Sequence, residues 1–243
     1  MGEAYGEDLA FIHDAGFGGV ARDAAAFLLG ALRRQGRGGG LVVDLGCGSG
    51  ILAGELSAAG YDVLGIDLSA AMVALARRRV PNGRFRRGSL LTAELPPCVA
   101  VTAVGECVNY RFDAGNTKQG LHQLFRRIYE ALCPGGLLVF DVAEPGRVPG
   151  SGPQRTFREG EGWAVLVTAE EDRRRELLTR RITSFRKVGA GYRRGHEVHQ
   201  LRLLRRSEVA GQLRGVGFRV RVLSGYGRER FPPGYAGFLA RKP

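Results

Sequence analysis

One stretch of the sequence, residues 42–50, limits the folds open to this chain more than any other. It reads Val-Val-Asp-Leu-Gly-Cys-Gly-Ser-Gly, an apolar segment that runs into glycines at 46, 48 and 50. Glycine lets the backbone turn sharply and leaves room for a ligand against the main chain. The amides that open a following helix favour polar or negative groups. The stretch therefore predicts a strand, a ligand-binding loop and a helix.

Two common nucleotide loops do not fit this stretch. The dinucleotide fingerprint G-x-G-x-x-G requires glycine at the position of Ile51, and no Gly-Lys-Ser/Thr follows as a P-loop requires.

Strand and helix signals alternate through the first 143 residues. An approximate helical stripe before residue 40, interrupted at residues 16–19, precedes them. Apolar segments predict strands at 41–45, 61–67, 84–87, 99–105 and 137–143, and helical patterns lie at 51–59, 69–79 and 117–132, with Ser69 as an N-cap. This alternation predicts a doubly wound, mostly parallel α/β sheet with right-handed crossovers.

The rhythm changes after residue 144. Residues 146–162 are rich in Gly, Pro and Arg and predict a loop, and three strand-like segments follow at 163–168, 177–188 and 192–204. A helix at 207–214, with Ser207 near its cap, and strands at 218–223 and 235–240 complete the chain. We therefore expect an N-terminal helical cap (1–40), a ligand-binding core (41–145 and 205–243) and an inserted antiparallel meander (146–204) that acts as a lid.

An acidic residue at the end of the second predicted strand supports the ligand-binding loop. Asp67 lies 23 residues after Asp44, and a carboxylate about 20 residues beyond a glycine loop can accept hydrogen bonds from both ribose hydroxyls. The alternative is that Asp67-Leu68-Ser69 only starts a helix. Together with the glycine loop, the pattern favours ligand binding.

These motifs resemble those of class I S-adenosylmethionine-dependent methyltransferases. The resemblance rests on D-L-G-C-G-S-G at 44–50, G-I-D-L-S at 65–69, R-G-S-L at 87–90 and L-C-P-G-G-L-L at 132–138, and it covers about residues 40–143. It implies a seven-stranded sheet of order 3-2-1-4-5-7-6 with strand 7 antiparallel, S-adenosylmethionine as the cofactor and no metal.

The resemblance also implies roles for individual residues. Asp44 would hold the loop and the methionine amine, the backbone of Gly46, Cys47 and Gly48 would follow the cofactor, and Asp67 would bind the ribose. The remaining implied cofactor contacts are Tyr5, Leu68, Met72, Ser89, Leu90, Gly105 and Glu106. The family often has Asp where this chain has Ser89.

Methyl transfer from a sulfonium needs alignment and a dry cavity more than a strong acid or base. The candidate catalytic residues are His13, Glu106, Tyr110 and His199. The meander resembles the lids of the small-molecule branch of the family, so we expect methyl transfer to an O, N or C atom of a small molecule.

The distribution of charge along the chain leaves alternative functions open. Residues 1–150 carry 15 basic and 15 acidic residues, whereas residues 151–243 carry 21 and 9, which accounts for the net charge of +12. This excess fits an anionic small-molecule substrate or a nucleic-acid methyltransferase, but 33 of the 36 cations are arginine, which is typical of codon bias. A non-catalytic cofactor-binding protein is a further alternative.

Compartment and assembly are expected from weaker signals. Four cysteines without a C-x-x-C pair, no secretion signal and no long apolar run favour a cytoplasmic protein that does not bind a membrane. We expect a monomer or a homodimer, with nucleic acid an unlikely partner.

Overall fold

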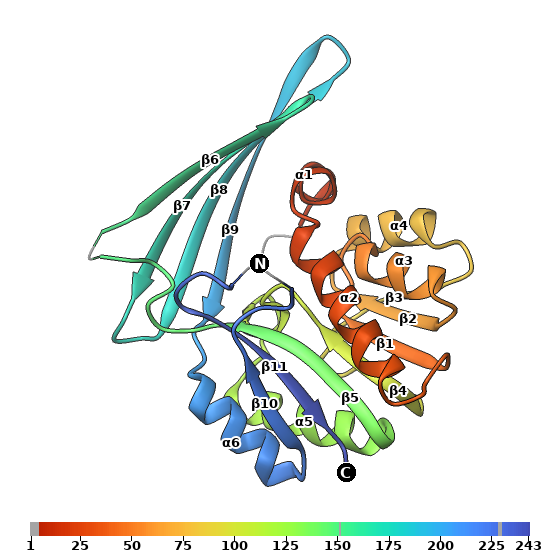
Figure 1. Cartoon of the computed structure of the whole chain (residues 1–243). Coiled ribbons are helices and arrows are strands. Elements are labelled where there is room, and N and C mark those ends of the chain that lie inside the picture. Colours follow the sequence, from red (N-terminus) through yellow and green to blue (C-terminus); the bar gives the residue numbers. More distant parts are fainter. Residues whose placement is uncertain (1–4, 151, 228–229) are drawn as a thin grey trace.

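The computed structural model describes residues 5–150, 152–227 and 230–243. The first four residues of the expected N-terminal cap lie outside these ranges, as does residue 151 of the expected lid. Two sheets, one of seven strands and one of four, organise the described chain (Figure 1).

The large sheet has the order β10-β11-β5-β4-β1-β2-β3. Its first five strands in the sequence are parallel to one another, and β11 is antiparallel to both β5 and β10. Counting β10 as the sixth strand and β11 as the seventh, this confirms the order 3-2-1-4-5-7-6. The strands are β1 (Leu41–Leu45), β2 (Asp62–Asp67), β3 (Arg84–Arg87), β4 (Cys98–Ala103), β5 (Leu132–Ala143), β10 (Arg219–Leu223) and β11 (Tyr235–Arg241).

Helices cover both faces of the large sheet. One face packs against α2 (Gly19–Arg33), α3 (Ile51–Ala58) and α4 (Ala70–Arg79), and the other packs against α5 (Lys118–Ala131) and α6 (Arg206–Val216). Along β5, alternate residues enter the two cores, because successive side chains of a strand point to opposite faces: Phe140 lies on the α5–α6 side and Val139 on the α2–α3 side.

One helix start follows the expected capping chemistry, and another does not. The Ser69 hydroxyl accepts from the Met72 amide at 3.1 Å, as predicted. Ser207 lies near the start of α6, as predicted, but its side chain does not cap it: α6 begins at Arg206, whose amide donates to the Glu144 carboxylate at 2.8 Å. A carboxylate that reaches across from the end of β5 thus replaces a local cap.

The second sheet is an antiparallel meander of β6 (Gln154–Gly160), β7 (Trp163–Asp172), β8 (Leu177–Val188) and β9 (Gly191–Arg202). The prediction of a loop over 146–162 was therefore wrong at β6. Every side chain of this edge strand is exposed, so it lacks the apolar alternation by which a strand is recognised.

The fifth strand also begins earlier than predicted. β5 starts at Leu132, directly after α5 ends at Ala131, and its pairing with β4 skips from Leu132 to Leu137. Gly135, at a φ of +75°, donates its amide to the Lys242 carbonyl at 3.0 Å. The Pro-Gly-Gly segment is thus a bulge inside the strand rather than a loop before it.

The two N-terminal helices pack against different sheets. α1 (Glu7–Gly16) packs Leu9 and Ile12 against Trp163, Val165 and Ile182 of the small sheet, whereas α2 lies on the large one (Figure 1). The division of the chain into cap, core and lid stays a prediction. None of the helices in the described ranges is by itself long and apolar enough to cross a membrane; only α1 and α2 together, bent by 59°, meet that test of length and composition.

Candidate active site

A cavity opens at the carboxyl ends of β1, β2 and β4. β1 lies between β2 and β4, so the chain order reverses there, and ligands of open α/β sheets bind at such switch points. The described residues that line this main cavity are Tyr5, His13, Gly46, Gly48, Ile66, Asp67, Leu68, Met72, Gly88, Leu90, Val104, Gly105, Cys107, Tyr110 and Phe112.

The glycine loop forms one side of the main cavity. The Gly46 and Cys47 amides donate to the Ile66 carbonyl at 2.7 and 3.1 Å, which fixes the loop against β2. Gly48 has a φ of +52°, and a Cβ on it would meet no atom within 4 Å. Because Gly48 lines the cavity, a side chain there would enter the space that a ligand needs.

Asp67 ties the loop to the next helix. Its carboxylate accepts from the Gly48 amide at 2.9 Å and from the Ser69 amide at 2.8 Å. Burial raises the pKa of this carboxyl, although these amides oppose the shift. Asp67 therefore takes part in a helix start and also lies on the cavity wall, so the two readings of this motif are compatible.

Asp44 lines a second cavity that shares part of its wall with the first. Its Oδ1 accepts from the Thr102 hydroxyl at 2.6 Å, whereas its buried Oδ2 has no partner among the described residues. Burial raises the pKa of Asp44 to about 7. A buried carboxylate oxygen without a donor suits a cationic amine.

Two tyrosines from distant parts of the chain meet on the far side of the main cavity. The Tyr5 and Tyr110 hydroxyls are 3.0 Å apart and hydrogen-bonded. Burial raises the pKa of both phenols, so both are neutral at neutral pH. Phe112 stacks on Tyr110 with ring centroids 5.0 Å apart. This part of the wall is aromatic and uncharged.

A carboxylate of the small sheet holds Tyr5 in place. Glu197 on β9 accepts from the backbone amides of Tyr5 and Gly6, both at 3.0 Å, and lies 2.8 Å from His199 Nε2. The Tyr5 carbonyl in turn accepts from the Ser69 hydroxyl at 2.7 Å. The start of α1 is thus tied to both sheets across the cavity.

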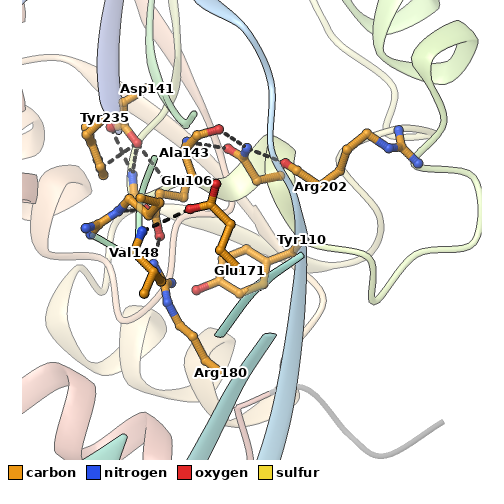
Figure 2. Close-up of polar contacts among 12 residues, drawn as sticks. Glu106, Tyr110, Asp141, Ala143, Val148, Glu171, Arg180, Arg202 and Tyr235 are labelled. Carbon is orange, nitrogen blue, oxygen red and sulfur yellow. Dashed lines mark hydrogen bonds and ion pairs between the residues drawn. The ribbon is translucent and has the colours of Figure 1, made fainter. Parts of the chain in front are cut away.

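Glu106 turns away from the main cavity. Its carboxylate lies 3.0 Å from Arg147 Nε and 2.7 Å from Arg180 Nη2. Figure 2 shows Glu106 and Arg180 with Tyr110 nearby. Burial raises the pKa of the Glu106 carboxyl, but Arg180 and Arg147 outweigh it and hold the pKa below its ordinary value. The Glu106 amide donates to Asp141 at 2.6 Å. Glu106 therefore joins the two sheets.

The structure brings most of the predicted site residues together. Those on the main cavity wall are Tyr5, His13, Gly46, Gly48, Asp67, Leu68, Met72, Leu90, Gly105 and Tyr110. Asp44 and Cys47 line the second cavity, and His199 lies behind the wall against Tyr5, Tyr110 and Phe112.

Ser89 and Glu106 are absent from the wall of either cavity. The Ser89 hydroxyl donates to Asp113 and accepts from the Leu91 amide at 2.9 Å, so it is already engaged.

Sequence reasoning missed several residues of the site. Arg180 is one of many arginines in a basic segment, and Phe112 follows no motif. Glu197 had a detectable signal, since residues two apart in a strand share a face and His199 was already a candidate.

The described residues fit S-adenosylmethionine. The unpartnered Asp44 Oδ2 suits the amine of the cofactor, and Asp67 retains lone pairs for its ribose. The open space at Gly48 lets the cofactor lie against the main chain of the loop. This combination on a doubly wound sheet with an antiparallel seventh strand defines a class I S-adenosylmethionine-dependent methyltransferase.

Comparison with known proteins agrees with this class. Residues 42–136 match the methyltransferase domain family. The putative methyltransferase YqeM of Bacillus subtilis is 26% identical over 191 residues, 74% of each chain. Residues 42–136 thus form a methyltransferase domain, and S-adenosylmethionine is its cofactor.

Two solved structures share the fold across nearly the whole chain. An S-adenosylmethionine-dependent methyltransferase from Clostridium acetobutylicum has a TM-score of 0.80 at 18% identity and covers 96% of both chains. The amino pentose methyltransferase CalS10 of Micromonospora echinaspora, bound to S-adenosylmethionine, has a TM-score of 0.76 at 23% identity and covers 100% of both. At these identities the likeness is one of fold.

Proposed function

We propose that this enzyme methylates an uncharged amine or hydroxyl group of a small molecule. The observation that carries the proposal is the composition of the main cavity wall beyond the glycine loop. Tyr5, His13, Tyr110 and Phe112 surround that part, and the described lining residues include no lysine or arginine. The similarity in fold to an amino pentose methyltransferase supports a small-molecule acceptor.

The basic charge of the C-terminal part does not reach this wall. Arg180 is the cation that acts on both Tyr5 and Tyr110, and Glu106 pairs with it at 2.7 Å. A buried guanidinium that already has a carboxylate partner has little to gain from a second anion. This favours an uncharged acceptor over the anionic one that composition suggested.

The chain's own residues would supply binding, orientation and exclusion of water. When bound, S-adenosylmethionine supplies an electrophilic methyl group for an in-line displacement. Asp44 and Asp67 would hold its two ends, and the start of α1, fixed by Glu197, would close the cavity above it. Alignment of this kind accounts for much of the rate of a bimolecular reaction.

A comparison of acceptor classes tests the proposal. The enzyme is incubated with S-adenosylmethionine labelled at the methyl group and with separate pools of amino sugars, alcohols, carboxylic acids and RNA. We expect label in the amino sugar or alcohol pool, and none with the Asp67→Ala variant. Label confined to the carboxylic acids or to RNA would contradict it.

A further inference from the structure

His13 occupies a place that no other titratable residue shares in the described structure. The main cavity and the second cavity have four lining residues in common, namely His13, Gly46, Gly48 and Val104. Of these, His13 alone has a polar side chain. It reaches this place from α1, whose start is tied to Glu197 of the small sheet.

The two cavities suit different parts of the cofactor, on the function proposed above. Asp44, with its orphaned oxygen, lines the second cavity and suits the methionine amine. Asp67 and Met72 line the main cavity and suit the adenosine. The sulfur joins these two parts of the molecule, so the shared wall is where the methyl group is transferred.

The His13 ring carries an unused polar atom at this point. Its Nδ1 is buried and has no hydrogen-bond partner among the described residues. Tyr5 meets the ring edge-on at 5.4 Å between centroids, and Phe17 stacks on it at 5.9 Å. Burial lowers the pKa of His13 to about 4, although Asp14 opposes the shift. The ring is therefore neutral at neutral pH, and a neutral imidazole has one nitrogen that accepts.

The other candidates have their polar atoms engaged or lie off the wall. The Tyr5 and Tyr110 hydroxyls bond to each other. The Nε2 of His199 contacts Glu197. Its Nδ1 also has no partner among the described residues, but its ring lies behind the tyrosines and lines neither cavity. A buried nitrogen without a partner costs stability, and on the wall of a cavity a ligand can supply the missing partner.

We propose that His13 Nδ1 accepts a hydrogen bond from the N–H or O–H group of the methyl acceptor at the shared wall of the two cavities. His13 is then the residue that orients the acceptor toward the methyl group. This proposal rests on the function proposed above, because it takes the cofactor to span both cavities.

Two cofactor analogues separate this role from simple cofactor binding. S-adenosylhomocysteine lacks a group at the transfer point, whereas sinefungin carries an amine there, on a carbon that replaces the methylated sulfur. Calorimetry gives the affinity of each for the wild type. We expect sinefungin to bind about tenfold more tightly, since a hydrogen bond from a charged donor is worth about 1.5 kcal/mol or more.

Variants of His13 then show whether that preference depends on the ring. In His13→Leu we expect the preference to fall to about one, with S-adenosylhomocysteine affinity within about twofold of the wild type. His13→Gln retains a neutral acceptor and should keep part of the preference, so a folding defect in one variant leaves the other. His196→Leu, at an exposed histidine of β9, is the matched control and should behave as the wild type.

Each other outcome has a distinct meaning. Equal affinity of the wild type for the two analogues would overturn the proposal, as would an unchanged preference in His13→Leu. Loss of S-adenosylhomocysteine binding in folded His13→Leu and His13→Gln would also overturn it, because the ring would then belong to the cofactor's own contacts. Failure of the wild type to bind either analogue would instead refute the function on which the proposal rests.

Discussion

Asp67 and Asp62 are two acidic residues at opposite ends of β2, in different surroundings. Asp67 lies on the wall of the main cavity and accepts from the Gly48 amide at 2.9 Å, whereas Asp62 is exposed. Asp67→Asn replaces one oxygen by a donor and should weaken S-adenosylhomocysteine binding about tenfold, because ribose hydroxyls lose an acceptor. Calorimetry measures the change, with Asp62→Asn as the matched control. Equal affinities of both variants would exclude Asp67 from ribose binding.

Asp44 gives stability a pH dependence of definite sign. Its pKa of about 7, against an ordinary 3.8, means that the folded state holds a proton which the unfolded state loses. Stability from this group is therefore full below about pH 4 and falls as pH rises to about 7. Asp44→Asn should remove this loss, which amounts to about 2–4 kcal/mol at full extent.

Urea unfolding of the wild type and Asp44→Asn from pH 4 to pH 8 checks the sign. The stability of the variant relative to the wild type should increase up to about pH 7 and then level off. An increment that stays constant with pH would show that Asp44 ionises normally in the folded protein.

Some residue-level features follow from the sequence because they act within a few positions. Asp67 and Ser69 are examples: a strand end, a carboxylate and a cap lie within three residues. The Ser89–Asp113 contact joins residues 24 apart, with β4 between them, and Asp113 lies in a segment without a periodic signal. The resemblance therefore implies Ser89 as a cofactor contact, although its hydroxyl is engaged elsewhere.

At the scale of elements, the start of α1 depends on one carboxylate of β9. Glu197→Ala removes the acceptor of the Tyr5 and Gly6 amides. These amides should exchange with deuterium faster, and S-adenosylhomocysteine should dissociate faster, because Tyr5 no longer covers the cavity. Hydrogen exchange and stopped-flow release measure the two effects. Glu170→Ala, at an exposed position of β7, is the control; identical exchange in both variants would show that Glu197 does not hold the segment.

Elements that bury an apolar face were predictable, and those that do not were missed. β1 has the predicted bounds, and β8 matches its strand-like segment. β6 is exposed along its whole length and is an edge strand that pairs with β7. A strand without a buried face shows no alternation of apolar and polar residues, so its sequence pattern does not reveal it.

At the scale of the whole molecule, the net charge of +12 is separate from the active site. Because no described lysine or arginine lines the main cavity, S-adenosylhomocysteine affinity should change less than about twofold between 50 and 500 mM salt. RNA binding, measured in parallel by fluorescence anisotropy, should be weak and fall steeply over the same range. Tight RNA binding that survives high salt would instead support the nucleic-acid alternative.

The order of the large sheet was predictable as a whole, because the resemblance of residues 40–143 fixes the first five strands and the topology of the rest. The way the small sheet meets the large one was not. Contacts such as Glu106 with Arg180 and Glu197 with Tyr5 join residues 74 and 192 positions apart, and such pairs carry no local pattern.

The central claim, that the cavity beside the glycine loop holds S-adenosylmethionine, is tested most directly by calorimetry on two matched glycine variants. Gly48 and Gly60 both have positive φ, +52° and +89°, and a Cβ on either would meet nothing within 4 Å, but only Gly48 lines the cavity. Gly48→Ala and Gly60→Ala should therefore lose similar stability, of about 1 kcal/mol. We predict that Gly60→Ala binds S-adenosylhomocysteine as the wild type does and that Gly48→Ala binds it at least about tenfold more weakly. Equal binding by the two variants would contradict the account.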